Sequence, residues 1–124
     1  PRCKGIHNSR IFADWVKDLH SYIVDQKKVE MLMWSDRFLD GNATGFGEWE
    51  ASKNDTWQLI DEIPKDIIMC DWHYGERESY PSVHYFSSKG FRFVACPWRE
   101  LNATQAFLNY VRNNVTPQYY GFLR

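Results

Sequence analysis

The sequence predicts an α/β fold in which about four short strands of a parallel sheet alternate with four helices. Short apolar runs, each followed by polar and aromatic residues, alternate with segments that have the spacing of amphipathic helices. The loops after the strands are long, whereas the returns from helix to strand are short, at Lys27-Lys28, Pro64-Lys65 and Gly90. Because parallel sheets bind ligands at the carboxyl ends of their strands, we expect the functional site in those long loops.

The first helix is expected from residue 9 to about residue 26, with Ser9 as its N-cap. Its apolar positions have helical spacing and are Phe12, Trp15, Val16, Leu19, Tyr22 and Ile23. A buried strand is expected at residues 29–35, and a polar segment with three glycines then runs from residue 36 to about residue 55. Loops of that length are uncommon in compact domains and usually serve a function.

The second unit consists of a short helix and a strand. We expect the helix at residues 56–63, where Pro64 stops it, and the strand at residues 66–72. Pro81 stands where a further helix would begin, because proline is favoured in the first helical turn. Gly90 is suited to the C′ position that closes this helix.

The last predicted elements are a strand at residues 91–96, halted by Pro97, a helix at 104–113 and a strand at 119–123. Strands and helices that alternate in this way form parallel sheets with right-handed crossovers. An open flavodoxin-like α/β domain is an alternative, and it would have a doubly wound strand order instead of a sequential one.

Length and charge exclude several classes of protein. The chain has 124 residues, which is one domain at most. Its net charge of −1 does not indicate a nucleic-acid or membrane-surface partner, and no apolar run approaches the roughly 20 residues of a membrane helix. We therefore expect no nucleic acid and no membrane among its partners. Four Asn-x-Ser/Thr sequons leave the cellular compartment open.

The three cysteines, Cys3, Cys70 and Cys96, are odd in number and widely spaced. This pattern suits neither a disulfide framework nor a zinc site. Cys70 and Cys96 fall in predicted strands, so we expect them to be buried free thiols. No Gly-rich phosphate loop follows a strand and no nucleophile-elbow pattern is present, so we predict no cofactor and no metal.

Aromatic residues make up 17% of the chain and include six tryptophans, which suits either a Trp-rich core or a surface that stacks on sugar rings. Position favours the second interpretation for three of them. Trp34, Trp72 and Trp98 each lie within a residue or two of a predicted strand end, beside a charged group. Trp15 and Trp57 lie in predicted helices and are assigned to the core, whereas Trp49 suits either role.

Carboxylates are abundant in the same loops, but only Asp36 and Asp71 lie at predicted strand ends. A glycosidase of the usual kind needs two carboxyl groups about 5 to 9.5 Å apart, a distance that a sequence does not contain. We therefore assign no catalytic residue. His73, beside Asp71, is a possible general base or metal ligand.

Five segments together resemble the second half of the catalytic barrel of family 20 glycoside hydrolases, the β-N-acetylhexosaminidase type. They are MWSDRFLDG at 33–41, GEWE at 47–50, IMCDWHY at 68–74, KGF at 89–91 and PW at 97–98. The resemblance covers almost the whole chain. It implies that residues 1–124 are a single partial domain, a parallel β/α half-barrel that corresponds to strands five to eight of a (β/α)8 barrel. It also implies a carbohydrate ligand that ends in N-acetylhexosamine, with Trp34 and Trp72 enclosing the acetamido methyl group.

Two departures from the family pattern bear on activity. The His-x-Gly-Gly-Asp-Glu segment that carries the family's catalytic Asp-Glu pair is absent. The strand-seven Tyr-x-Asp is also absent from residues 94–98. We therefore expect a fragment that supplies substrate-binding aromatic residues and does not hydrolyse sugars alone. The predicted substrate-binding residues are Trp34, Asp36, Asp71, Trp72, Tyr74 and Trp98.

A half-barrel leaves two sheet edges unpaired, so we expect it to associate with another copy or with the missing N-terminal half. The alternative function is a non-catalytic carbohydrate-binding or interaction module with the same aromatic rim.

Overall fold

The computed structural model describes residues 3–47, 49–114 and 117–122. Its helices are α1 (Asn8–His20), which continues as a π-helical segment (Ser21–Gln26), α2 (Pro81–Ser88) and α3 (Leu101–Asn113). Its strands are β1 (Leu32–Trp34), β2 (Ile68–Trp72), β3 (Phe93–Cys96) and β4 (Tyr119–Phe122). Two 3-10 helices, Asp36–Phe38 and Thr56–Glu62, lie between β1 and β2. The predicted alternation of strands and helices is present. The second predicted helix, at residues 56–63, is the 3-10 helix Thr56–Glu62.

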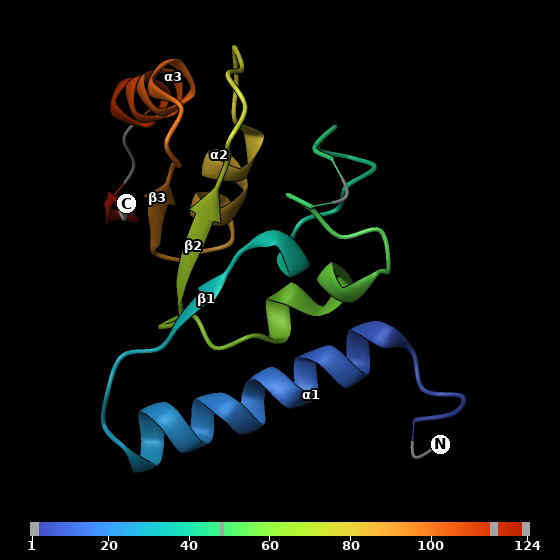
Figure 1. Ribbon diagram of the computed structural model, residues 1–124. Coiled ribbons are helices and arrows are strands. Elements are labelled where there is room, and N and C mark those ends of the chain that lie inside the picture. The colour runs from blue at the N-terminus through green and yellow to red at the C-terminus, as the bar shows by residue number, and fades with distance from the viewer. Residues whose placement is uncertain (1–2, 48, 115–116, 123–124) are drawn as a thin grey trace.

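The four strands form one parallel sheet in the sequential order β1-β2-β3-β4. The register pairs Trp34 with Cys70 and Trp72 with Cys96, so the strand ends lie at one edge of the sheet. The structure confirms the predicted parallel β/α half-barrel (Figure 1). The sequential order excludes the doubly wound alternative, in which the strand order reverses partway across the sheet.

Successive residues of each strand face opposite sides of the sheet. One side packs against α2 and α3, and its buried residues include Met69, Phe93 and Ala95. The other side carries a separate cluster of Ile68, Cys70, Val94 and Cys96, with Trp72 packed against it. In a half-barrel the first side is the outside, covered by helices, and the second is the inside. Cys70 and Cys96 are buried free thiols, as predicted.

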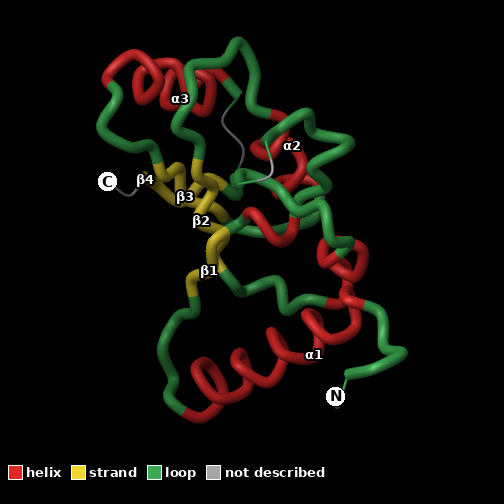
Figure 2. The backbone as a smooth tube through the Cα atoms, turned by 45° about the vertical axis from the view of Figure 1, so that its right-hand side comes forward, coloured by secondary structure: helices red, strands yellow, loops and turns green. Residues whose placement is uncertain are grey.

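Helix α1 lies on the side of β1 that faces away from β2 (Figures 1 and 2). It packs chiefly on the 3-10 helix Thr56–Glu62, and an ion-pair cluster ties the two together. Arg10 and Lys17 of α1 bind the carboxylate of Glu62, at 2.6 and 2.7 Å. The helix therefore extends beyond the edge of the sheet.

Several predicted boundaries were wrong. Helix α1 begins at Asn8 rather than after Ser9, because the His7 ring accepts the Ser9 backbone N–H at 3.3 Å and so caps the helix. Strands β1, β2 and β3 begin two or three residues later than predicted, whereas β4 begins at Tyr119, as predicted. Helix α3 begins at Leu101, three residues before the predicted start. Gly90 follows the C-cap residue Lys89 of α2 and has a φ of +78°, as its predicted C′ role requires.

The assignment of Trp15 to the core was also wrong, since half of this side chain is exposed. Its helical spacing was correct, but the side of α1 that carries it has no further element to cover it within the part of the chain that the structure describes. Trp57 is half-buried. No helix among the described residues has the length and apolar character needed to cross a lipid bilayer.

Candidate functional site

Four of the predicted site residues line one open hollow of about 270 Å³ at the carboxyl ends of β1 and β2: Trp34, Asp36, Trp72 and Tyr74. Trp34 and Trp72 are the last residues of their strands. Asp36 opens the 3-10 helix that follows β1, and Tyr74 lies two residues beyond β2. The parallel register brings these residues together, because it places both strand ends on the same edge of the sheet.

A hydrogen bond between the two strand ends orients the Trp72 indole. Its Nε1–H donates to Oδ1 of Asp36 at 3.3 Å. The other oxygen of Asp36 lies 3.1 Å from Nε of Arg37. The carboxylate is thus held from both sides, and it remains an acceptor at the wall of the hollow.

The aromatic residues form a continuous row along this edge of the sheet. The rings of Trp72 and Tyr74 have centroids 4.8 Å apart, and those of Tyr74 and Trp98 are 5.1 Å apart. The Arg99 guanidinium lies 4.2 Å from the Trp98 ring. Trp98 joins the site through Tyr74 and does not line the hollow itself. The row presents ring faces to solvent, since Trp98 is half-exposed and Tyr74 is 40% exposed.

Asp71 does not join the other predicted residues. Its side chain is fully buried on the helix-covered side of the sheet, because it lies between Cys70 and Trp72, whose side chains face the opposite side. Ser82 donates a hydrogen bond to it at 2.7 Å and Ser35 donates one at 3.3 Å. The burial of Asp71 leaves no surface for a ligand to contact, so the prediction that it binds substrate is replaced by a structural role.

His73 is buried beside Asp71, and the carboxylates around it favour its protonated form. Its Nε2 lies 3.1 Å from Oδ1 of Asp71 and 2.9 Å from Oγ of Ser82. Its Nδ1 lies 3.6 Å from Oε2 of Glu50. Burial alone would lower the pKa of His73, but the Asp71 and Glu50 carboxylates outweigh it and raise the pKa to about 9. His73 is enclosed and does not reach the hollow as a general base.

Glu50 connects the long loop after β1 to the segment after β2. Its Oε1 accepts the backbone N–H of Tyr74 at 3.2 Å, and its Oε2 accepts a bond from the Arg77 guanidinium at 2.8 Å. Burial would raise the pKa of Glu50, but its contacts with His73, Tyr74 and Arg77 lower it below its usual value. Glu50 therefore carries a negative charge that is fully engaged in holding the loop.

These positions determine what the hollow can do chemically. Asp36 is the one carboxylate that lines it among the described residues, and Glu50 is engaged behind Tyr74. The hollow therefore offers flat aromatic faces and one hydrogen-bond acceptor. Within the described ranges, no group of three or more His, Cys, Asp or Glu side chains is placed to hold a metal ion.

Sequence reasoning missed two residues near the site. It left Trp49 undecided and did not single out Arg77, yet both line a second hollow beside Trp72 and Tyr74. No local pattern could have indicated Arg77, because its role depends on an ion pair with a residue 27 positions away.

Comparison with protein-family models and with curated proteins found no match for this chain.

Proposed function

We propose that this chain is the carbohydrate-binding half of a glycoside hydrolase barrel of the family 20 type. In this proposal it binds terminal N-acetylhexosamine residues and lacks the catalytic Asp-Glu pair. The observation that carries the proposal is the hollow formed by Trp34, Asp36, Trp72 and Tyr74 at the carboxyl ends of two parallel strands.

The composition of the hollow suits a sugar. Indole and phenol rings pack against the C–H faces of pyranose rings and against an acetamido methyl group, which are flat apolar surfaces. A carboxylate at the wall accepts hydrogen bonds from hydroxyl or amide N–H groups, as Asp36 accepts the indole N–H of Trp72. A mostly apolar concave surface with a few directed polar groups is the usual form of a small-ligand site.

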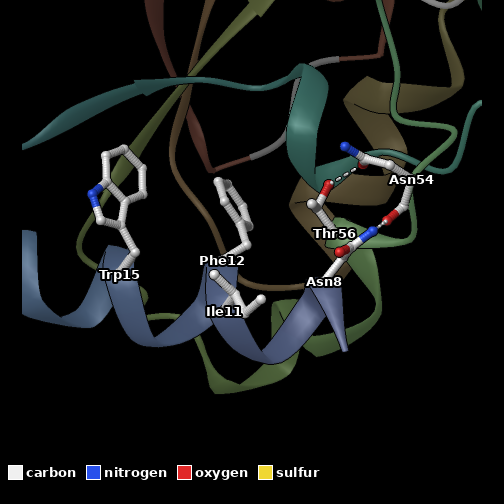
Figure 3. A pocket seen from close by; sticks show the side chains of 6 residues that line it. All are labelled: Asn8, Ile11, Phe12, Trp15, Asn54 and Thr56. Carbon is white, nitrogen blue, oxygen red and sulfur yellow. Dashed lines mark hydrogen bonds between the residues drawn. The ribbon is translucent and has the colours of Figure 1, made fainter. Parts of the chain in front are cut away.

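The free edge of β1 supports the second part of the proposal, that a further half-barrel completes the fold. Between this edge and α1 lies an apolar groove of about 590 Å³, which we call the edge groove. It is lined by Phe12, Trp15, Leu19, Ile23, Met31, Leu32, Met33, Trp34, Asp36, Arg37 and Cys70. Leu32 is 48% exposed and Trp15 is 51% exposed. The apolar surface continues along α1, where Phe12 and Trp15 also line a smaller hollow (Figure 3).

The position of α1 favours a parallel strand as the occupant of the edge groove. In a right-handed crossover, the helix covers the seam between the strand that precedes it and the strand that follows it. Helix α1 precedes β1 and lies beyond its free edge, where it would cover a seam with one more strand. The carboxyl end of such a strand would lie beside Trp34 and Asp36. A further half-barrel, either a second copy or the missing N-terminal half, would supply it.

The proposal is tested by titrating the chain with N-acetylglucosamine while the indole N–H signals are followed by NMR. We expect millimolar binding that shifts the signals of Trp34 and Trp72. Trp34→Ala or Trp72→Ala should weaken binding about tenfold, or about 1.4 kcal/mol. Tyr22→Ala removes an aromatic residue that is about as exposed as Trp34 but does not line the hollow, and it should leave affinity unchanged. Equal effects of all three substitutions would contradict the proposed site.

A hydrolysis assay on a chromogenic N-acetylglucosaminide completes the test. We expect no turnover from the chain alone, because the hollow presents one carboxylate where a glycosidase of the usual kind needs two. The second candidate function is a non-catalytic sugar-binding or interaction module, which the engagement of Asp36 by Trp72 and Arg37 favours. Turnover that appears when an N-terminal half-barrel is added would exclude that candidate.

A further inference from the structure

We propose that this chain is modified by N-linked glycosylation, and that Asn42 and Asn102 are the asparagines that carry the glycans. This inference is independent of the proposed function, because it concerns sugars attached to the chain and not sugars bound by it. It starts from the threonines. The chain has four of them, and each stands two residues after an asparagine, at positions 42, 54, 102 and 114. None of the residues between is a proline, so all four triplets are acceptor sequences for N-linked glycans.

Composition alone does not explain this pairing of asparagine with threonine. The chain has seven asparagines, eight serines and four threonines. If the twelve hydroxyl residues were scattered at random over 124 positions, an asparagine would be followed at this distance by one of them less than once on average. Four asparagines are, and in each case the hydroxyl residue is threonine, although serine is twice as abundant.

The fold accounts for the hydroxyl groups of these triplets but not for their asparagines. The hydroxyl of Thr44 donates to the carbonyl of Asp40 at 2.9 Å, and that of Thr104 donates to the carbonyl of Trp98 at 2.8 Å. A serine could make the same bonds. Neither bond involves the asparagine that precedes the threonine, so the asparagine needs a separate explanation.

Asn42 and Asn102 both have side chains without a structural role. Asn42 lies in a turn of the loop after β1, where its backbone N–H donates to Oδ1 of Asp40 at 2.9 Å. Asn102 is the second residue of α3. Both residues are exposed, and neither side chain makes a hydrogen bond within the part of the chain that the structure describes. A glycan attached to either amide would therefore displace no contact of the fold.

The fold does explain the other two asparagines. The amide oxygen of Asn54 accepts the hydroxyl groups of Ser52 and Thr56, the latter at 3.0 Å (Figure 3 shows Asn54 and Thr56). Asn114 is half-buried, and its side-chain nitrogen donates to the carbonyl of Tyr110 at 2.9 Å. The remainder of that triplet, residues 115 and 116, lies outside the described residues. We therefore assign the glycans to the two asparagines that have no such role.

Glycans at these two positions are compatible with the surfaces described above. Neither Asn42 nor Asn102 lines the hollow at the strand ends or the edge groove. The attachment points lie in the segments that follow β1 and β3, outside both surfaces. A sugar ligand and a further half-barrel could therefore still reach their sites.

The modification is a group transfer from a lipid-linked oligosaccharide diphosphate. The side-chain nitrogen Nδ2 forms a bond to the anomeric carbon of the first sugar, and the bond from that carbon to the diphosphate oxygen breaks. The amide gives up one proton as the lipid diphosphate leaves. N-linked glycans are found on surface segments of secreted proteins, so the proposal also implies that the chain enters a compartment that holds the transferase.

The experiment uses the protein isolated from the cells that produce it. Peptide N-glycosidase in heavy-oxygen water converts a glycosylated asparagine into a labelled aspartate, which peptide mass spectrometry locates. A digest without the enzyme controls for spontaneous deamidation. We expect the label at both Asn42 and Asn102. An unmodified asparagine at either position, or label at Asn54 or Asn114 alone, would overturn the assignment.

Asn102→Gln and Asn109→Gln form a matched pair of variants on α3. Both asparagines are exposed, but Asn109 is followed by Tyr110 and Val111 and is therefore no acceptor. In the same cells, Asn102→Gln should lose one glycan and Asn109→Gln none, and equal masses of the two variants would contradict the proposal. Without glycans, Asn102→Gln should melt at the temperature of the unsubstituted chain. A clearly lower melting temperature would assign Asn102 to the fold instead.

Discussion

His73 is the residue whose burial has the clearest thermodynamic consequence. It is fully enclosed between two carboxylates, and aromatic rings surround it, with the centroids of Phe46, Tyr80 and Phe107 at 4.4, 5.2 and 5.0 Å. The folded protein stabilises its protonated form, since its pKa is raised to about 9. In an unfolded chain the imidazole has its ordinary pKa of about 6.5. Folding therefore takes up a proton between these values.

We predict that stability falls as the pH rises through this range. The contribution of His73 is complete below about pH 6.5 and is lost as the pH approaches 9, which amounts to roughly 3 kcal/mol in the free energy of unfolding. Urea unfolding at intervals from pH 6 to pH 9.5 measures it. His84→Gln, which removes an exposed histidine, should keep this slope, whereas His73→Gln should remove it. A flat profile for the unsubstituted protein would contradict a charged His73.

The cysteines give a second prediction at the residue scale. Cys3 is exposed, whereas Cys70 and Cys96 are 5% and 4% exposed on the inner side of the sheet. The neighbouring Cys70 thiol and burial both raise the pKa of Cys96, which suppresses its reactive thiolate form. The contact with Cys96 lowers the pKa of Cys70, so burial is what shields Cys70 from the reagent. We expect Ellman's reagent to modify one thiol at once and the other two only after denaturation. Cys3→Ser should abolish the fast reaction, and three fast thiols would show that the inner side is open.

Trp34, Asp36, Trp72 and Tyr74 come together as predicted, because parallel strands bring their carboxyl ends to one edge. Asp71 does not join them. The alternation of side chains along β2 was evident, but which side the helices cover is decided by packing between distant segments.

At the scale of elements, the long loop after β1 is held by contacts that span the sequence. It begins beside β1, forms a bridge between Asp40 and Ser52, and is fixed to the segment after β2 through Glu50. The sequence predicted a functional loop from its length and glycines. The path of this loop depends on the contacts of Glu50 with Tyr74 and Arg77, which lie 24 and 27 residues further along the chain. No local sequence pattern encodes such pairings.

The free edge of β1 gives a prediction about association. The carbonyl of Met31 and the amide of Ser35 bond to β2, so the backbone groups of Leu32 point to the unpaired edge. Leu32→Pro removes an edge donor without disturbing the β1–β2 ladder and should weaken association with a further half-barrel at least about tenfold. Leu32→Val keeps the donor and should associate normally.

Sedimentation velocity over a range of concentrations measures this effect. Self-association of the unsubstituted chain that Leu32→Pro weakens would identify a second copy as the occupant of the edge groove. A monomer at several hundred micromolar would contradict a second copy and leave the N-terminal half-barrel as the partner to test.

At the scale of the whole molecule, the half-barrel has a covered outer side and an incomplete inner side. Helices α2 and α3 seal the outer side over Met69, Phe93 and Ala95. The inner cluster of Ile68, Cys70, Val94 and Cys96 is buried, but Leu32 and Trp34 at the β1 edge remain about half exposed. The candidate site lies at this incomplete end, so binding and assembly are expected to depend on each other.

The alternation of strands and helices, the parallel half-barrel and the aromatic rim could be predicted from the amino acids, because side-chain periodicity, capping residues and the return of parallel strands are local physical constraints. The burial of Asp71, the raised pKa of His73, the exposure of Trp15 on α1 and the position of Trp49 beside Tyr74 could not be predicted in this way. Each of these depends on which distant segments share a surface, and the free energy of those contacts arises only once the elements pack together.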